Sequence, residues 1–201
     1  NLLSGTIPFA VGSLTKLTSL VVRQNSLGGA VPSSLGLLSL AAELSISGNC
    51  LTGSIPSSLG CLTNLVTLDV GSNSLAGGSL PSSLGKMSSL VYFASTYNTY
   101  TGSIPSSIGS LSALEVFSVV DASLPGPLPP AVGCLTALRQ LFVHGSQLTG
   151  RVPAALWDLT ELQGLSLYSN RLSGSIASSI GLLSSLTVFY GSQNKFMSSL
   201  P

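Results

Sequence analysis

The sequence predicts a right-handed α/β repeat solenoid, with a parallel β-sheet on its concave face and short 3₁₀ or helical turns on its convex side. The prediction rests on a fixed period, a short alternating apolar segment in each period, and a proline-to-glycine turn after it. Self-similarity at about 24 residues is typical of coils whose repeats bury their apolar edges against their neighbours. One column shows the period, with steps of 24, 24, 25, 24, 24, 24 and 24: Leu14, Leu38, Leu62, Met87, Leu111, Leu135, Leu159 and Leu183.

The period predicts one solenoid over residues 1–201, with repeats starting near those eight positions and a partial repeat at 1–13. The chain opens and closes inside a repeat, and neither end carries an evident cap. Because terminal repeats need a polar outer face, the sequence indicates an uncapped fragment of a longer protein.

Each repeat contains a short strand followed by a turn. In the repeat that starts at Leu14, Leu20 and Val22 are two residues apart, a spacing typical of a strand with one face inward. Residues 32–36 begin with proline and end with glycine, as short helical or 3₁₀ segments do. The one additional residue in the chain, at Gly77–Gly78, should be absorbed as a bulge on a loop.

An asparagine follows the strand in most repeats, where the backbone turns inside the packed coil. A buried side-chain amide both donates and accepts, so stacked asparagines can satisfy backbone groups that the strands leave unpaired. Ala122 and Ser146 interrupt this ladder beside a proline-rich run at 125–130, and we expect the coil to be least regular there. The ladder comprises Asn1, Asn25, Asn49, Asn73, Asn98, Asn170 and Asn194.

Composition excludes several classes of partner. Seven basic and six acidic residues give a net charge of +1, which provides no basic patch for nucleic acid or an anionic membrane. Only 6% of residues are charged, against roughly 25% in ordinary domains. No apolar run approaches the roughly 18 residues of a membrane span, so we expect no direct membrane insertion of this segment.

At these positions the chain resembles the leucine-rich-repeat family in its plant-type form, whose pattern is LxxLxxLxLxxNxLxGxIPxxLGx. Residues 62–75 match the first half of the pattern and residues 51–60 the second, and the resemblance covers all 201 residues. It extends to receptor-like kinase and receptor-like protein ectodomains and to polygalacturonase-inhibitor-like proteins. The resemblance implies an extracellular or cell-surface location and recognition of a protein or peptide by the concave face.

Residues that flank the inward strand positions should point outward on the concave face. Small polar residues dominate the first half of that face, and aromatic residues gather in the second. Tyrosine and arginine often anchor interfaces because they bury much area at little entropic cost. We expect Glu115 and Arg139, which share a column in adjacent repeats, to pair across strands. The predicted partner-binding residues are Tyr92, Tyr97, Arg139, Phe142, His144, Tyr168 and Tyr190.

No catalytic, cofactor or metal site is predicted. The single histidine, His144, has Asp121 one repeat before it and Ser118 or Ser166 nearby, but serine is so common here that such a coincidence is expected. Cys61 and Cys134 share a phase three repeats apart, roughly 15 Å at about 4.8 Å per strand, too far for a disulfide. We therefore expect the cysteines to be small buried apolar residues.

Two alternatives to partner recognition remain from the sequence. The chain could be a structural subunit of a larger assembly. It could also be an ice-binding protein, because paired serines align as uncharged hydroxyl rows along the coil. These pairs are Ser33–Ser34, Ser57–Ser58, Ser82–Ser83, Ser106–Ser107 and Ser178–Ser179.

Overall fold

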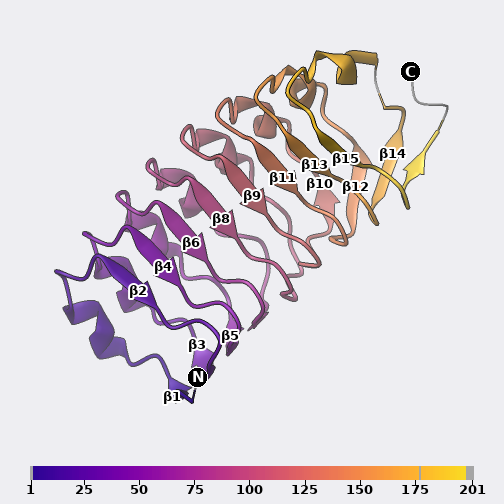
Figure 1. Ribbon diagram of the computed structural model, residues 1–201. Coiled ribbons are helices and arrows are strands. Elements are labelled where there is room, and N and C mark those ends of the chain that lie inside the picture. The colour runs from indigo at the N-terminus through magenta and orange to yellow at the C-terminus, as the bar shows by residue number, and fades with distance from the viewer. Residues whose placement is uncertain (1, 177, 198–201) are drawn as a thin grey trace.

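A computed structural model describes residues 2–176 and 178–197 and shows the predicted coil, in which successive repeats stack side by side from one end to the other (Figure 1). Asn1, the first member of the predicted ladder, lies outside the described residues. Within them, every sheet is parallel and every helix is a 3₁₀ turn of five residues. The fold class is therefore the one that the sequence predicts.

The concave sheet takes one strand from each repeat. Its central residues point inward in unbroken register, as where Leu44 pairs with Leu20 on one side and Leu68 on the other. Residues on either side of each centre face outward, because side chains alternate along a strand. Among the described residues the sheet has eight strands: β2 (Ser19–Val21), β4 (Glu43–Ser45), β6 (Thr67–Asp69), β8 (Tyr92–Ala94), β9 (Val116–Ser118), β11 (Gln140–Phe142), β13 (Gly164–Ser166) and β15 (Val188–Tyr190).

A second wall of parallel strands follows the turns, and the sequence analysis did not predict it. These strands are two to five residues long and often contain glycine, so no apolar alternation marks them. In the described part of the chain they form two sheets. The first holds β1 (Ser4–Thr6), β3 (Ser26–Ala30), β5 (Cys50–Gly53) and β7 (Ser74–Leu75), and the second holds β10 (Gly126–Pro127), β12 (Leu148–Arg151), β14 (Arg171–Gly174) and β16 (Lys195–Phe196).

The 3₁₀ turns stack on one another along the remaining side of the coil. In six of the eight described turns a glycine near the end allows close approach to the next repeat: a Cβ at Gly60 would overlap the carbonyl oxygen of Ser83. The turns are η1 (Phe9–Ser13), η2 (Ser33–Leu37), η3 (Ser57–Cys61), η4 (Ser82–Lys86), η5 (Ser106–Ser110), η6 (Pro130–Cys134), η7 (Ala154–Asp158) and η8 (Ser178–Leu182). In η7, Trp157 occupies the position of this glycine.

The inward columns form one continuous apolar core. Leu62, Leu65 and Leu68 are fully buried, and Met87 fills the leucine position of its repeat without exposure. Phe93 and Phe117 stack at 5.4 Å between ring centroids in the middle of the coil. Each repeat thus buries its apolar edge against two neighbours, which is why the fold needs the period to persist.

The asparagine ladder performs the predicted task. Asn49 Oδ1 accepts the Leu27 amide at 3.0 Å, and its Nδ2 donates to the carbonyl oxygens of Val22 and Ile46 at 3.1 and 3.0 Å. Asn73 and Asn170 make equivalent bonds in their own repeats. The side chains therefore join adjacent repeats where strand hydrogen bonds end.

The coil is least regular at the predicted interruption. Ser146 Oγ partly replaces an asparagine by donating to the Val119 carbonyl oxygen and accepting the Ala122 amide at 3.3 Å. Ala122 offers no side-chain acceptor, and the Tyr100 amide reaches only its carbonyl oxygen, at 3.3 Å. Here the second wall divides into its two sheets, between β7 and β10. The additional residue is absorbed nearby, in a loop where Gly77 and Gly78 adopt φ of 91° and 93°.

The prediction of buried cysteines is wrong. Cys50, Cys61 and Cys134 are exposed free thiols. Cys50 lies on β5 and the other two end 3₁₀ turns, so all three occupy positions where the repeat faces solvent. Their apolar character misled the prediction, because burial here depends on phase within the repeat and not on residue type.

Candidate functional site

Three outward columns make up the concave surface. One column runs Thr67, Tyr92, Val116 and Gln140, and a second runs Asp69, Ala94, Ser118 and Phe142, as the strand register shows. A third lies just after the strands, where the chain starts to turn. The pairing keeps each column in line, so residues far apart in sequence become neighbours at about 4.8 Å per strand.

Four predicted residues come together toward the C-terminal end of this surface. The rings of His144 and Tyr168 are neighbours, with centroids 6.3 Å apart and planes at 57°. Phe142 lies against Gly164, where the missing side chain makes room for its ring. Ser166 separates Phe142 from Tyr190 in their shared column, and Tyr190 is 60% exposed. We call Phe142, His144, Tyr168 and Tyr190 the aromatic patch.

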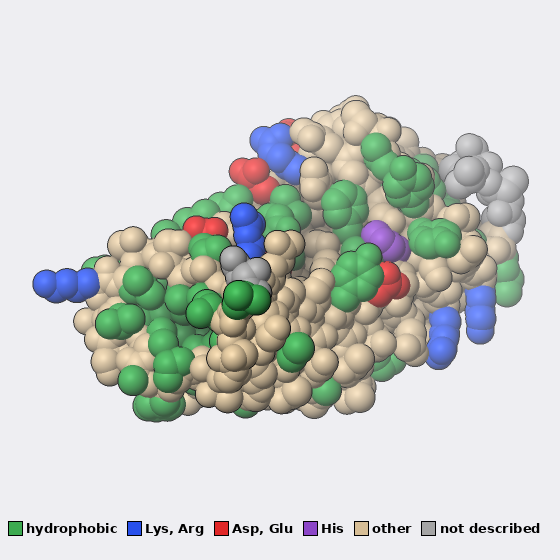
Figure 2. All heavy atoms as spheres, turned by 60° about the horizontal axis from the view of Figure 1, so that its bottom comes forward, with side chains coloured by type: hydrophobic (Ala, Val, Ile, Leu, Met, Phe, Trp, Pro, Cys, Tyr) green, Lys and Arg blue, Asp and Glu red, His purple; other side chains and the backbone are tan. Residues whose placement is uncertain are grey.

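The space-filling view shows the setting of this patch. In Figure 2 the histidine (purple) lies among hydrophobic side chains (green), with one acidic side chain (red) directly beside it. Tyr168 and Tyr190 are exposed, and Phe142 and His144 are half-buried. The patch therefore presents rigid apolar area to solvent.

The other three predicted residues lie apart from the patch. Arg139 Nε lies 3.7 Å from Glu115 and its Nη1 lies 3.8 Å from Glu161, so the predicted pair is present as part of a trio. All three side chains are about half exposed, and such a pair contributes only about 0.2–1 kcal/mol. Tyr97 lies on a turn with a φ of 51° and is 58% exposed.

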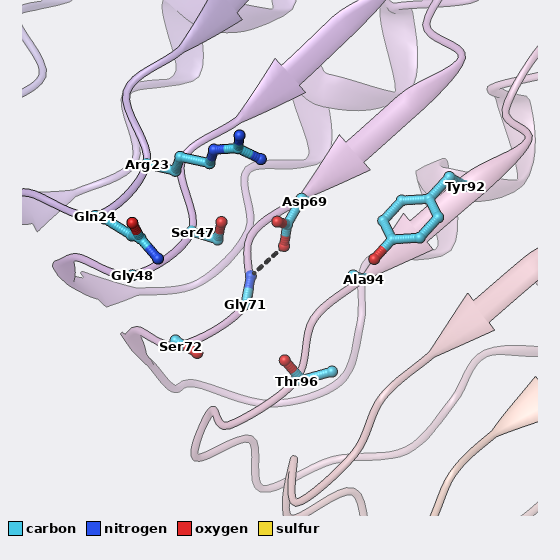
Figure 3. A pocket seen from close by; sticks show the side chains of 10 residues that line it. All are labelled: Arg23, Gln24, Ser47, Gly48, Asp69, Gly71, Ser72, Tyr92, Ala94 and Thr96. Carbon is cyan, nitrogen blue, oxygen red and sulfur yellow. Dashed lines mark hydrogen bonds between the residues drawn. The ribbon is translucent and has the colours of Figure 1, made fainter.

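Tyr92 belongs to a different feature, which the sequence analysis did not identify as a site. The turns after β2, β4, β6 and β8 enclose a hollow of about 390 Å³ on the concave surface (Figure 3). Nearly all of its side chains can donate or accept a hydrogen bond. We call it the polar pocket, lined by Arg23, Gln24, Ser47, Gly48, Asp69, Gly71, Ser72, Tyr92, Ala94 and Thr96.

Opposite charges face this pocket. Arg23 comes from the first turn and Asp69 from the end of β6, and among the described residues neither forms an ion pair. One oxygen of Asp69, Oδ1, accepts the Gly71 amide at 3.0 Å. Partial burial and the nearby Asp69 carboxylate raise the pKa of the Tyr92 phenol, so Tyr92 keeps its proton at neutral pH.

The sequence analysis predicted Tyr92 as a binding residue and small polar residues around it, but it did not predict that Arg23, Gln24 and Asp69 converge with Tyr92. The available signal was their columns: Arg23 lies in the third column, Asp69 in the second and Tyr92 in the first. The first, third and fourth of the four repeats that line the pocket thus place the three side chains diagonally across the sheet. The sequence did not show that the surface is hollowed here, because the hollow depends on how the turns after the strands curve.

Nothing in the described residues assembles a catalytic triad. The Nδ1 atom of His144 is buried and has no hydrogen-bond partner, so Asp121 does not orient the imidazole as a triad requires. No group of three or more His, Cys, Asp or Glu side chains in the described part could hold a metal ion. Nor does any helix there have the length and apolarity to cross a membrane.

The serine rows divide into two kinds. The second serine of a pair is turned toward the preceding repeat: Ser34 Oγ donates to the Phe9 carbonyl oxygen at 2.6 Å, and Ser58 Oγ donates to that of Ser33 at 2.7 Å. The hydroxyls of Ser83 and Ser107 are buried as well. Only the first serines form an exposed row: Ser33, Ser57, Ser82, Ser106 and Ser178.

Comparisons with known proteins agree with this architecture. The sequence profile of the family described as Leucine Rich Repeat matches residues 42–62, 64–87 and 161–183. No curated protein sequence matches the chain.

Solved structures supply the closer parallels. A TDR receptor is 33% identical over 96% of this chain, with a TM-score of 0.94. The Arabidopsis receptor kinase HAESA, solved with the peptide hormone IDA and the co-receptor SERK1, is 33% identical over 96% of this chain, with a TM-score of 0.90. This chain spans about a third of the length of each receptor chain, 33% in both cases.

A plant ice-binding protein is also similar, with 27% identity over 99% of this chain and 63% of that protein, and a TM-score of 0.85. The family profile thus agrees with the repeat pattern, and the solved structures agree with the geometry of the coil. The chain is built of leucine-rich repeats, and its solenoid is similar to those of plant receptor ectodomains.

Proposed function

We propose that this chain is a non-enzymatic recognition module, part of an extracellular or cell-surface protein, that binds a protein or peptide along its concave face. The observation that carries the proposal is the aromatic patch: rings from three consecutive repeats, on the concave strands and the turns that directly follow them, partly exposed to solvent. Such rings lose little conformational entropy on binding and bury much area.

The surface sets the size of the ligand segment. From Tyr92 on β8 to Tyr190 on β15 the sheet advances by four strand steps, about 19 Å at roughly 4.8 Å per step. An extended chain covers about 3.3 Å per residue, so a segment of about six residues would span this distance. Tyr97 and Arg139 lie at the rim of this track and would add polar contacts.

The similar receptors support the class of ligand. HAESA was solved with a peptide hormone and a co-receptor, and its chain matches this one with a TM-score of 0.90. Because this chain spans a third of that receptor, its own partner is inferred from its surface and not transferred.

The test compares capture of partners by two matched triple variants. Phe142→Ser, Tyr168→Ser and Tyr190→Ser together remove the patch, and Leu37→Ser, Leu40→Ser and Leu182→Ser remove exposed leucines away from the concave strands. Extracellular extract is passed over wild type and both variants, each checked by circular dichroism, and bound proteins are identified by mass spectrometry. Loss of a partner from the patch variant alone supports the proposal. Retention by that variant contradicts it, and favours the structural-subunit alternative if the leucine variant loses the partner.

Ice binding is a second candidate, favoured by the exposed row of first serines and by the similar ice-binding protein. The exposed row is one serine wide instead of two, because the second serine of each described pair points toward the neighbouring repeat or is partly buried. Thermal hysteresis of the wild type and of Ser57→Lys with Ser82→Lys decides it. Hysteresis that the lysines abolish would establish ice binding, and its absence in the wild type removes the candidate.

A further inference from the structure

We infer that the polar pocket is a second binding site on the concave face, and that its ligand is a short neutral oligosaccharide. The inference does not depend on peptide recognition at the aromatic patch, although Tyr92 belongs both to the pocket and to the start of the peptide track. It rests on the charge balance, the hydrogen-bonding groups, the aromatic wall and the rigidity of the pocket.

The charges select against ionic ligands. Arg23 and Asp69 both line the hollow, and they cancel each other. A strongly anionic ligand attracted by Arg23 would meet the Asp69 carboxylate, and a cation would meet the guanidinium, so like-charge contacts disfavour both. The best complement carries no net charge but offers both donors and acceptors.

The hydrogen-bonding groups of the pocket are complementary to a ligand with many hydroxyl groups. Arg23 supplies only donors and Asp69 only acceptors, while Gln24 and the hydroxyls of Ser47, Ser72 and Thr96 do both. Asp69 uses Oδ1 for the Gly71 amide, which leaves Oδ2 for the ligand. Ala94 is the only aliphatic side chain in the lining, so an apolar peptide side chain would find little to contact.

Tyr92 supplies the apolar element that a sugar ring also needs. Its ring forms one wall of the pocket in Figure 3, opposite Arg23 and Gln24. A sugar presents hydroxyls at its edge and C–H groups on its face, so its face can pack on the phenol while its edge bonds to the polar groups. The Tyr92 hydroxyl is a donor at physiological pH, as any phenol is, and can bond to a ring hydroxyl of the sugar.

The pocket is pre-organised by the ladder beneath it. The amide groups of Asn49, Asn73 and Asn98 donate to the carbonyl oxygens of Ser47, Gly71 and Thr96, each a pocket-lining residue. This is the stretch where the asparagine ladder is unbroken, so the turns are held before a ligand arrives, which lowers the cost of binding. The volume of about 390 Å³ lies within the roughly 300–1,000 Å³ of small-ligand sites.

A buried polar atom lies beside the pocket. Ser45 is 3% exposed, its hydroxyl has no hydrogen-bond partner among the described residues, and its register partner on β6 is Asp69. A buried hydroxyl without a partner costs about 1–3 kcal/mol, so the polar groups at this part of the concave face are not all satisfied by the protein itself.

The experiment measures binding of defined oligosaccharides by saturation-transfer NMR and calorimetry. The probes are di- to tetrasaccharides of glucose, xylose, mannose and galactose, with galacturonic acid oligomers as the acidic comparison. Variants are Arg23→Ala, which removes an exposed side chain without a recorded structural bond, together with Asp69→Ala and Tyr92→Ala. The controls are Asp158→Ala, on η7 away from the pocket, and the triple patch variant.

We expect a neutral oligosaccharide to bind, and each pocket variant to weaken it at least tenfold, while both controls bind like wild type. Asp69→Ala also leaves the Gly71 amide without its side-chain acceptor, so circular dichroism is used to check that this variant is folded. If it is not folded, the outcome is decided by the binding of Arg23→Ala. No neutral saccharide bound at millimolar concentration, preference for the acidic oligomers, or binding unchanged by the pocket variants would each overturn the inference. Because the patch variant is a control here, failure of peptide recognition leaves this result unaffected.

Discussion

Tyr100 and Ser95 form a buried pair that replaces two apolar positions of the repeat. Outside the last repeat, which has Phe196 and Gly191 there, Tyr100 stands where other repeats have leucine, and Ser95 where they have valine, isoleucine or leucine. Their hydroxyls are 2.6 Å apart, and Tyr100 is only 3% exposed. A larger residue facing a smaller one preserves the volume of the core, and the hydrogen bond satisfies both polar atoms.

Removing either hydroxyl alone should lower the free energy of unfolding by more than half of the loss seen when both are removed. Ser95→Ala leaves the Tyr100 hydroxyl buried without a partner, and Tyr100→Phe does the same to Ser95, each at about 1–3 kcal/mol. The double variant loses both groups together, so urea unfolding should show a loss at least about 1 kcal/mol smaller than the sum. Strictly additive losses would mean that the two hydroxyls do not interact.

The same pair predicts a fall in stability at alkaline pH. Burial raises the pKa of Tyr100 to about 12, although its bond to Ser95 acts in the opposite direction. Because the fold favours the protonated phenol, its contribution is complete below pH 10 and is lost as pH rises from 10 to about 12. A difference of about two units between the folded and unfolded pKa corresponds to about 2–3 kcal/mol of unfolding free energy. Tyr100→Phe should therefore show a shallower fall in free energy of unfolding than wild type over that range; parallel curves would contradict the assignment.

At the scale of elements, the stacked 3₁₀ turns depend on glycine. A Cβ at Gly60 would overlap the Ser83 carbonyl oxygen, whereas one at Gly181 in η8 would meet nothing within 4 Å. Six glycines at this phase make such a close approach to the following turn: Gly12, Gly36, Gly60, Gly85, Gly109 and Gly133.

We therefore expect Gly60→Ala to destabilise the coil by about 1–3 kcal/mol, because the backbone of the next repeat must shift. Gly181→Ala is the matched control and should change the free energy of unfolding by less than about 0.5 kcal/mol. Thermal or urea unfolding measures both. Equal effects would show that the turns do not pack as closely as described.

At the scale of the whole molecule, the coil has one weak point. The second wall has no continuous strand pairing between β7 and β10 among the described residues, where an isolated bridge from Ala76 to Thr99 and scattered hydrogen bonds such as Tyr100 N–H to the Ala122 carbonyl oxygen replace the ladder. A left-handed residue such as Asp121 precedes the ladder position in each of the described repeats, but here Ser123, just after that position, also adopts a φ of 49°, a conformation that costs energy away from glycine. Because a solenoid is stabilised only between neighbours, such a point can open without unfolding the rest.

Native-state hydrogen exchange should locate this opening. Amides at 99–103 and 121–126 should exchange at least tenfold faster than those of β4 and β5, where ladder and second wall are both intact. Uniform protection along the coil would mean that Ser146 restores the ladder fully.

The two ends of the concave face then serve different chemistry. The polar pocket lies over the unbroken ladder, and the aromatic patch begins in the repeat of Ser146, where the ladder is interrupted. The concave sheet itself is continuous between them.

The sequence by itself determined the coil, its period, the asparagine ladder and the site of its interruption. It could do so because each of these depends on the phase of a residue within the repeat, which is local information. It also placed the aromatic residues in shared columns, since register follows from the period. Only the tertiary structure decided the second wall, the exposure of the cysteines, the inward orientation of the second serine in the pairs such as Ser34 and Ser58, and the polar pocket. These depend on how turns curve and pack across repeats, and a spacing along one chain carries no measure of depth.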